Sequence, residues 1–189
     1  ERAPGRAADP VPAARAGAEM SFTRFARVVH GLARGLQVVA EIAVVVLLVL
    51  VAHEVFRRYA LNSPTQSSVE FSEYLLVLIS FASAAWVLRR DRHVRVRLVV
   101  DALPPRPRAA LEVVGMALLA GFCAVLVWKG AAMAWTAFHG GDRSSSLVAF
   151  PLWIPYSFIP AGGLVLGLEA LVRMGDALAV ARGRAPASD

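Results

Sequence analysis

The chain has 189 residues, 57% of them hydrophobic, and a formal net charge of +6 at pH 7. Soluble domains are about 45–50% apolar, so this composition excludes an ordinary soluble domain and favours a membrane protein. The single cysteine, Cys123, allows no disulfide within the chain, which excludes the disulfide-exchange membrane proteins that need paired thiols. A small packing residue is the simplest reading of Cys123.

The N-terminal residues 1–20 are rich in Ala, Pro, Arg and Gly and contain no apolar signal-peptide segment, so we expect a disordered tail. Residues 21–35 place apolar side chains on one helical face and Arg24, Arg27 and Arg34 on the opposite face. A basic amphipathic helix before a membrane span usually lies in the headgroup plane, where its arginines contact lipid. The alternative is that this helix continues the first span into the cytoplasm.

Four apolar stretches approach the length of about 20 residues that a helix needs to cross a bilayer core of about 30 Å. They predict an all-α integral membrane protein with a four-helix domain at residues 21–175 and a cytoplasmic tail at 176–189. The predicted spans are about 36–56, 70–88, 109–130 and 153–173.

The basic residues indicate the orientation of the chain. Sixteen of the 20 Lys and Arg residues lie before the first span, between the second and third, or after the fourth. The positive-inside rule therefore places both termini and the central loop in the cytoplasm. That loop lacks the interleaved aromatic side chains that stack on bases, so we expect lipid contacts rather than a nucleic-acid site. Those predicted contacts are Arg89, Arg90, Arg95 and Arg97.

Ionisable side chains within or beside the spans are candidate sites, because such positions are costly. Glu41 lies within the first span and is either a functional group or a polar packing contact. Arg57 and Arg58 end that segment, while Glu70 and Glu73 share one helix face where the second span begins. We expect an Arg–Glu cluster there. It is either a clamp between the spans or a contact for a partner protein or an anionic solute.

The third and fourth spans carry further special residues. Lys129 lies 17 residues after Glu112, about 26 Å along a helix at 1.5 Å per residue, where it could reach the outer interface or pair with the acidic residues of the second span. Three prolines are expected to make the start of the fourth span irregular, and three glycines to let a second helix approach closely. They are Pro151, Pro155 and Pro160, followed by Gly162, Gly163 and Gly167.

The histidines and the catalytic motifs give little support to an enzyme. His53 and His139 fall on the same predicted side, so a bis-histidine haem is conceivable, although neither lies inside a predicted span. The sequence contains no HExxH, CxxC, P-loop or nucleophile elbow. We therefore expect no enzymatic activity, no cofactor and no metal.

The order of these features resembles the small membrane subunit of TRAP (tripartite ATP-independent periplasmic) transporters, the DctQ-type family. The resemblance covers most of residues 36–172, with Val69 and Ser83 standing where the family often has Trp and Gly. The positions that correspond are Arg58, Tyr59, Glu70, His93, Asp101, Ser145, Pro151, Trp153, Tyr156, Pro160 and Gly162.

The resemblance implies a scaffold role in the bacterial inner membrane. Such a subunit anchors a large, elevator-type (DctM-type) membrane subunit and helps receive a periplasmic (DctP-type) solute-binding protein, in sodium-driven uptake of a carboxylate. Arg57, Arg58, Glu70, Glu73, His93 and Asp101 then become candidates for partner or structural contacts. Two alternatives stay open: a haem- or quinone-linked anchor of an oxidoreductase, and an autonomous small transporter that uses Glu41, Glu112 and Glu169.

Overall fold

The computed structural model describes residues 13–62, 66–90, 105–145 and 148–181. They form four helices, which are α1 (Ala13–Ala60), α2 (Gln66–Arg89), α4 (Pro105–Gly140) and α5 (Trp153–Ala181). Each is long and apolar enough to cross a membrane. Within these ranges the β-structure is limited to one isolated bridge, between Arg143 and Pro151. The all-α class with four membrane helices is therefore confirmed.

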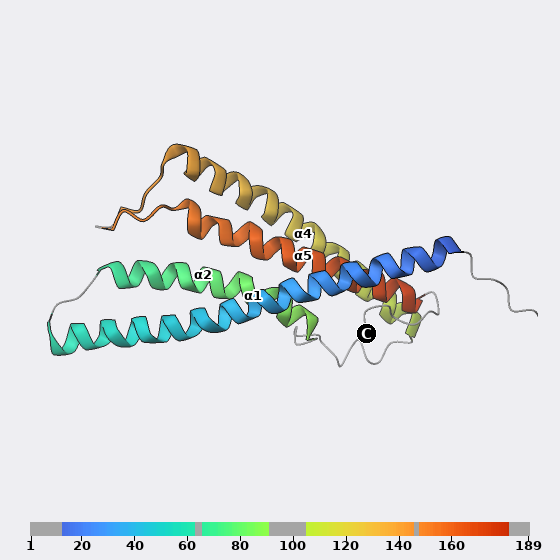
Figure 1. Cartoon of the computed structure of the whole chain (residues 1–189), viewed down its shortest axis with the longest axis horizontal. Helices are drawn as coiled ribbons and strands as arrows, with labels where there is room; N and C mark the ends of the chain where they lie inside the picture. Colours follow the sequence, from blue (N-terminus) through green and yellow to red (C-terminus); the bar gives the residue numbers. More distant parts are fainter. Residues whose placement is uncertain (1–12, 63–65, 91–104, 146–147, 182–189) are drawn as a thin grey trace, which may run out of the picture.

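The helices are arranged as two antiparallel hairpins (Figure 1). One hairpin is α1 and α2, the other is α4 and α5, and the two converge where α1 crosses α5. The most extensive packing is between α4 and α5, and α2 packs on both α1 and α5. Because α4 packs mainly on α5, it forms one edge of the molecule.

Helix α1 differs from the expectation at its N-terminal end. It begins at Ala13 and continues without a break to Ala60, so residues 13–20 are helical rather than part of a tail, and residues 21–35 are continuous with the first span. Ala-rich sequence such as that at 13–18 favours a helix. Whether residues 21–35 lie in the headgroup plane stays a prediction.

The face of α1 that packs overlaps the expected apolar face only in part, since Phe22 and Leu36 pack against the buried residues. Ala26, Val29 and Ala33 are buried against the other helices, whereas Phe25 and Leu32 are exposed. Small side chains are selected at this crossing because they let two helix backbones approach closely. Size, rather than hydrophobicity alone, decides which face is covered.

Helix α5 is more regular than its prolines suggested. It starts at Trp153 and includes both Pro155 and Pro160. Pro155 lies in the first turn, where its missing N–H would have no intrahelical partner in any case. Pro160 lies further in, and its ring packs against Gly130 of α4, where an added Cβ would be only 3.0 Å from the proline Cδ. The expected irregular segment is therefore confined to the chain before Trp153.

Glycine and alanine hold the hairpins together. A Cβ on Gly162 of α5 would lie 2.6 Å from both the Cβ and the carbonyl oxygen of Phe81 in α2. Ala82 and Ala85 of α2 are buried beside this contact, and Cys123 of α4 is buried in the same core. The close approach that the sequence predicted for the glycines is thus made within the chain, between α5 and its two neighbours.

Candidate functional site

A polar cluster is buried where α1, α2 and α5 meet. His30 Nε2 of α1 lies 3.4 Å from Glu169 Oε1 of α5, and the Glu169 side chain is only 1% exposed. One helical turn further along α5, Arg173 Nη2 donates a 2.6 Å hydrogen bond to the carbonyl oxygen of Arg89, the last residue of α2. Arg89, Arg173 and Asp176 are close enough for their charges to act on Glu169. We call these five residues the buried polar cluster.

The buried polar cluster joins three helices by a charge-assisted contact and a helix cap. Arg173 satisfies one of the carbonyl groups that the end of α2 leaves without an intrahelical partner. Glu169 Oε2 is buried and has no hydrogen bond within the described part of the chain. An ionised carboxylate in such a place is costly unless it is paired, so His30 and the neighbouring arginines are required for this arrangement.

Sequence reasoning did not find this cluster. His30 was given no role, and Glu169 entered only as one carboxylate of the autonomous-transporter alternative. A glutamate inside an apolar helix does indicate that a partner lies at the same depth. Which residue of α1 faces Glu169 depends on how α1 is rotated against α5. The spacing of apolar residues in either helix does not specify that rotation.

The opposite end of the hairpins carries an aromatic cluster. Tyr74 of α2 donates a 2.5 Å hydrogen bond to Glu70 Oε1, one turn before it. Its ring stacks on Phe150 at 5.4 Å, and Phe71 meets Phe150 edge-on at 5.5 Å. These contacts attach the segment between α4 and α5 to the start of α2, so Glu70 takes part in holding this connection in place.

The two arginines near that end of the molecule, Arg57 and Arg58, differ in their surroundings. Arg58 is exposed, with its Nη2 3.6 Å from Glu54 Oε1 on the same helix. Arg57 is partly buried, and Glu73 is exposed. The clamp between the first two spans stays a prediction. The structure shows in addition that Glu54 lies beside Arg58.

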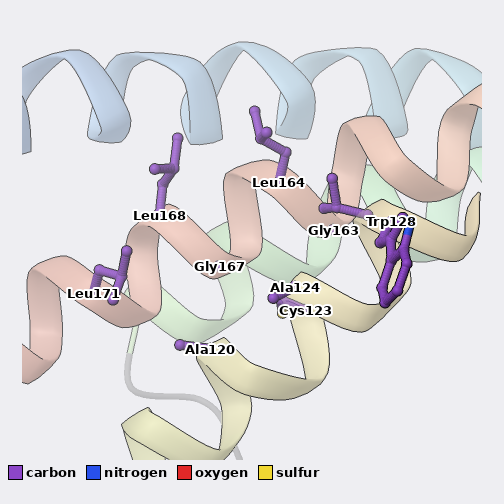
Figure 2. Close-up of a pocket in the computed structure, with 10 residues that line it drawn as sticks. Ala120, Cys123, Ala124, Trp128, Gly163, Leu164, Gly167, Leu168 and Leu171 are labelled. Atoms are coloured by element: carbon purple, nitrogen blue, oxygen red, sulfur yellow. The ribbon is translucent and has the colours of Figure 1, made fainter. Parts of the chain in front are cut away.

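An apolar groove of about 490 Å³ lies between α4 and α5 (Figure 2). Leu164 and Leu168 line it and project toward α1, and Trp128 lies at one end. Gly163 and Gly167 form its floor on α5. All its lining residues are apolar or glycine, so the groove has no side chain that would recognise a polar solute.

The arrangement and the order of helices can now be compared with known proteins. The family model for the DctQ component of tripartite ATP-independent periplasmic transporters matches residues 46–180, from the middle of α1 to the end of α5. The chain belongs to the DctQ family. It is 28% identical over 117 residues to the ectoine TRAP transporter small permease protein TeaB of Halomonas elongata, with 62% of this chain covered. The chain spans 60% of the length of TeaB.

A second DctQ-type relative is covered more fully. A Haemophilus influenzae protein, provisionally named a TRAP transporter small permease protein, is 26% identical over 147 residues, which are 77% of this chain and 88% of that protein. No solved structure matches the chain. The DctQ resemblance inferred from sequence order and spacing is therefore confirmed.

Several of the expected DctQ positions lie in or beside the segment between α4 and α5. Ser145 is exposed, and Pro151 takes part in the isolated bridge with Arg143. Trp153 begins α5 and meets Phe138 of α4 edge-on at 5.6 Å. Tyr156 is partly buried in the first turns of α5, about one turn from the Pro160–Gly130 contact.

The remaining predicted residues lie at the other end or outside the described ranges. Arg24, Arg27 and Arg34 are exposed along α1, and Arg90 is exposed after α2 with its guanidinium 4.8 Å from the centre of the Trp86 ring. These exposed arginines are free to contact lipid, which stays a prediction. His93, Asp101, Arg95 and Arg97 lie outside the described residues.

The residues of the two alternatives are dispersed. His53 and His139 lie on α1 and α4, whose ends near these residues are at opposite edges of the molecule in Figure 1, so the structure does not bring the two conceivable haem ligands together. Glu41, Glu112 and Glu169 lie on three different helices, and Glu169 faces His30.

Proposed function

We propose that this chain is the non-catalytic scaffold subunit of a TRAP transporter. It anchors a large DctM-type membrane subunit in the inner membrane and helps a DctP-type periplasmic protein deliver its solute. The observation that carries this proposal is the DctQ match over residues 46–180, which includes all of α2, α4 and α5.

The placement of polar groups supports a scaffold. The buried polar cluster and the aromatic cluster each connect the chain's own helices, at opposite ends of α2. The groove between α4 and α5 is apolar. Such an arrangement stabilises a rigid body and leaves solute and ion binding to the large subunit, whose sodium-coupled uptake of a carboxylate completes the proposal.

The orientation belongs to the same proposal. Both termini and the central loop face the cytoplasm, because these segments hold sixteen of the 20 basic residues. The loop between α1 and α2 and the segment between α4 and α5 then face the periplasm. The aromatic cluster would hold the second of these segments in position for the binding protein.

Co-purification tests the proposal. The tagged chain, co-expressed with the large TRAP subunit from the same genome, should retain it through affinity and size-exclusion chromatography in a mild detergent. A tagged chain that elutes alone, while remaining folded and monodisperse, would contradict a scaffold role. A Soret band in the purified chain would instead favour the haem-linked alternative.

A further inference from the structure

Lys129 is an exposed cation on the apolar surface of α4. Its Nζ lies 5.2 Å from the centre of the Trp128 ring, and it makes no ion pair or hydrogen bond with any residue that the structure describes. Val125 and Met133, one turn to either side, are 54% and 47% exposed. An isolated positive charge therefore stands on a face otherwise suited to lipid or to a protein partner.

The packing of the helices shows how deep this charge lies. Gly163 of α5 contacts Val127, and Gly130 contacts Pro160, so Lys129 is level with the residues just before Gly162. Gly162 in turn contacts Phe81 of α2. The register thus places Lys129 within about one helical turn of the level of Phe81.

Helix α2 is used to measure the distance to each boundary of the bilayer core, because it is the shortest of the four candidate spans, at Ser67–Arg89. Phe81 is 8 residues from Arg89 and 11 from Glu70, or about 12 Å and 16 Å at 1.5 Å per residue. A bilayer core about 30 Å thick that extends from Glu70 to Arg89 therefore has Lys129 near its middle. This is deeper than the sequence alone suggested.

A lysine at that depth cannot be explained by contact with headgroups. Its four-carbon stem reaches on the order of 6 Å, less than the distance to either end of α2. The acidic residues that the structure describes form no ion pair with it either. Glu70 is at the far end of α2 and accepts a hydrogen bond from Tyr74, while Glu41 lies on α1 and accepts a 3.1 Å hydrogen bond from Gln37. An intramembrane charge of this kind requires a counter-charge from outside the chain.

We propose that the Lys129 face of α4 docks against a transmembrane helix of the large subunit that presents an Asp or Glu at mid-bilayer depth. The inference rests on the proposed function and adds to it the docking face and the chemistry of the contact. The carboxylate neutralises Lys129, and the exposed apolar side chains along the same face of α4 pack around the pair. The ion pair fixes the register of the two subunits.

The test uses the same co-expressed complex with substitutions of Lys129. Lys129→Met keeps the length of the side chain and removes its charge, and should lower recovery of the large subunit at least about tenfold, since an unpaired carboxylate is left buried. Lys129→Arg should retain the complex to within about threefold. Arg143→Met, which removes an exposed cation beyond the end of α4, should leave recovery unchanged.

A charge exchange identifies the partner group. Lys129→Glu should abolish the complex, and one Asp or Glu within a span of the large subunit, when changed to Lys, should restore it. Equal recovery of the large subunit by Lys129→Met and the wild type would overturn the proposal. It would also be overturned if no carboxylate exchange rescued Lys129→Glu, or if Lys129→Met unfolded the chain on its own.

Two further outcomes are distinguishable. A homodimer of this chain that Lys129→Met dissociates would place Lys129 at an interface between two copies of the chain and overturn the proposal. Failure of the wild-type chain to hold the large subunit would instead contradict the proposed function itself.

Discussion

At the scale of single residues, the contact between His30 and Glu169 stabilises the point where the two hairpins converge. Both side chains are largely covered, and Glu169 is 1% exposed. Removing one partner of a buried polar contact costs more than replacing both partners with apolar residues, because the remaining polar group is left without a hydrogen bond. The sequence could indicate that Glu169 needs a partner but not which residue provides it.

His30→Ala should therefore destabilise the purified chain by about 1–3 kcal/mol, measured by thermal unfolding in detergent. His53→Ala, which removes an exposed histidine from the same helix, is the matched control and should change the melting temperature little. The double variant His30→Leu with Glu169→Leu should recover most of the loss. Equal effects of His30→Ala and His53→Ala would show that the contact does not stabilise the fold.

A second prediction concerns the aromatic cluster. Phe150→Ala removes both ring contacts to α2 and should make the segment between α4 and α5 more accessible to protease or to hydrogen exchange. Tyr74→Phe keeps the stacked ring and removes the hydroxyl hydrogen bonds to Glu70 and Ser144, at a cost of about 1 kcal/mol each. Protection unaffected by Phe150→Ala would show that the segment is held by other contacts.

At the scale of helices, steric fit decides how α5 meets its neighbours. The sequence predicted close approach at the glycines of the fourth span, and the structure places Gly162 against Phe81 accordingly. It could not predict that Pro155 and Pro160 lie within a regular helix, because that depends on the position of the helix start and on the space left by Gly130. The N-terminal extension of α1 was missed because residues 13–20 contain Met20 as their only large apolar side chain, which marks no helical face.

Gly162→Ala should weaken the α2–α5 contact, because the new methyl group would lie 2.6 Å from a backbone oxygen. Forcing extra volume into a packed core costs about 1–3 kcal/mol, so the melting temperature should fall. Gly121→Ala is the control, since a Cβ at Gly121 meets nothing within 4 Å. If both variants behave alike, α2 and α5 do not approach as closely as described.

At the scale of the whole molecule, the fold class could be predicted from the sequence better than the contacts within the fold. The class and the number of membrane helices followed from composition and span length, because apolar stretches of about 20 residues have few other solutions. The positions of residues such as Arg58 and Glu70 along the helices could also be anticipated. The internal partners could not, as Glu54 beside Arg58 and Tyr74 on Glu70 illustrate.

Cysteine labelling tests the orientation. Leu61→Cys and Ser145→Cys, both at exposed positions, should react with a membrane-impermeant maleimide added to spheroplasts. Arg90→Cys should react only after permeabilisation, because the basic segment after α2 faces the cytoplasm. The native Cys123, which is 1% exposed, should stay unlabelled throughout. The reverse pattern would invert the proposed topology.

Uptake by reconstituted proteoliposomes tests the central claim most directly. Vesicles that hold the large subunit together with this chain, supplied with the solute-loaded binding protein and an inward sodium gradient, should accumulate solute. Vesicles that hold either membrane subunit alone should not. Uptake by the large subunit at the same rate without this chain, or uptake by this chain alone, would contradict the scaffold account.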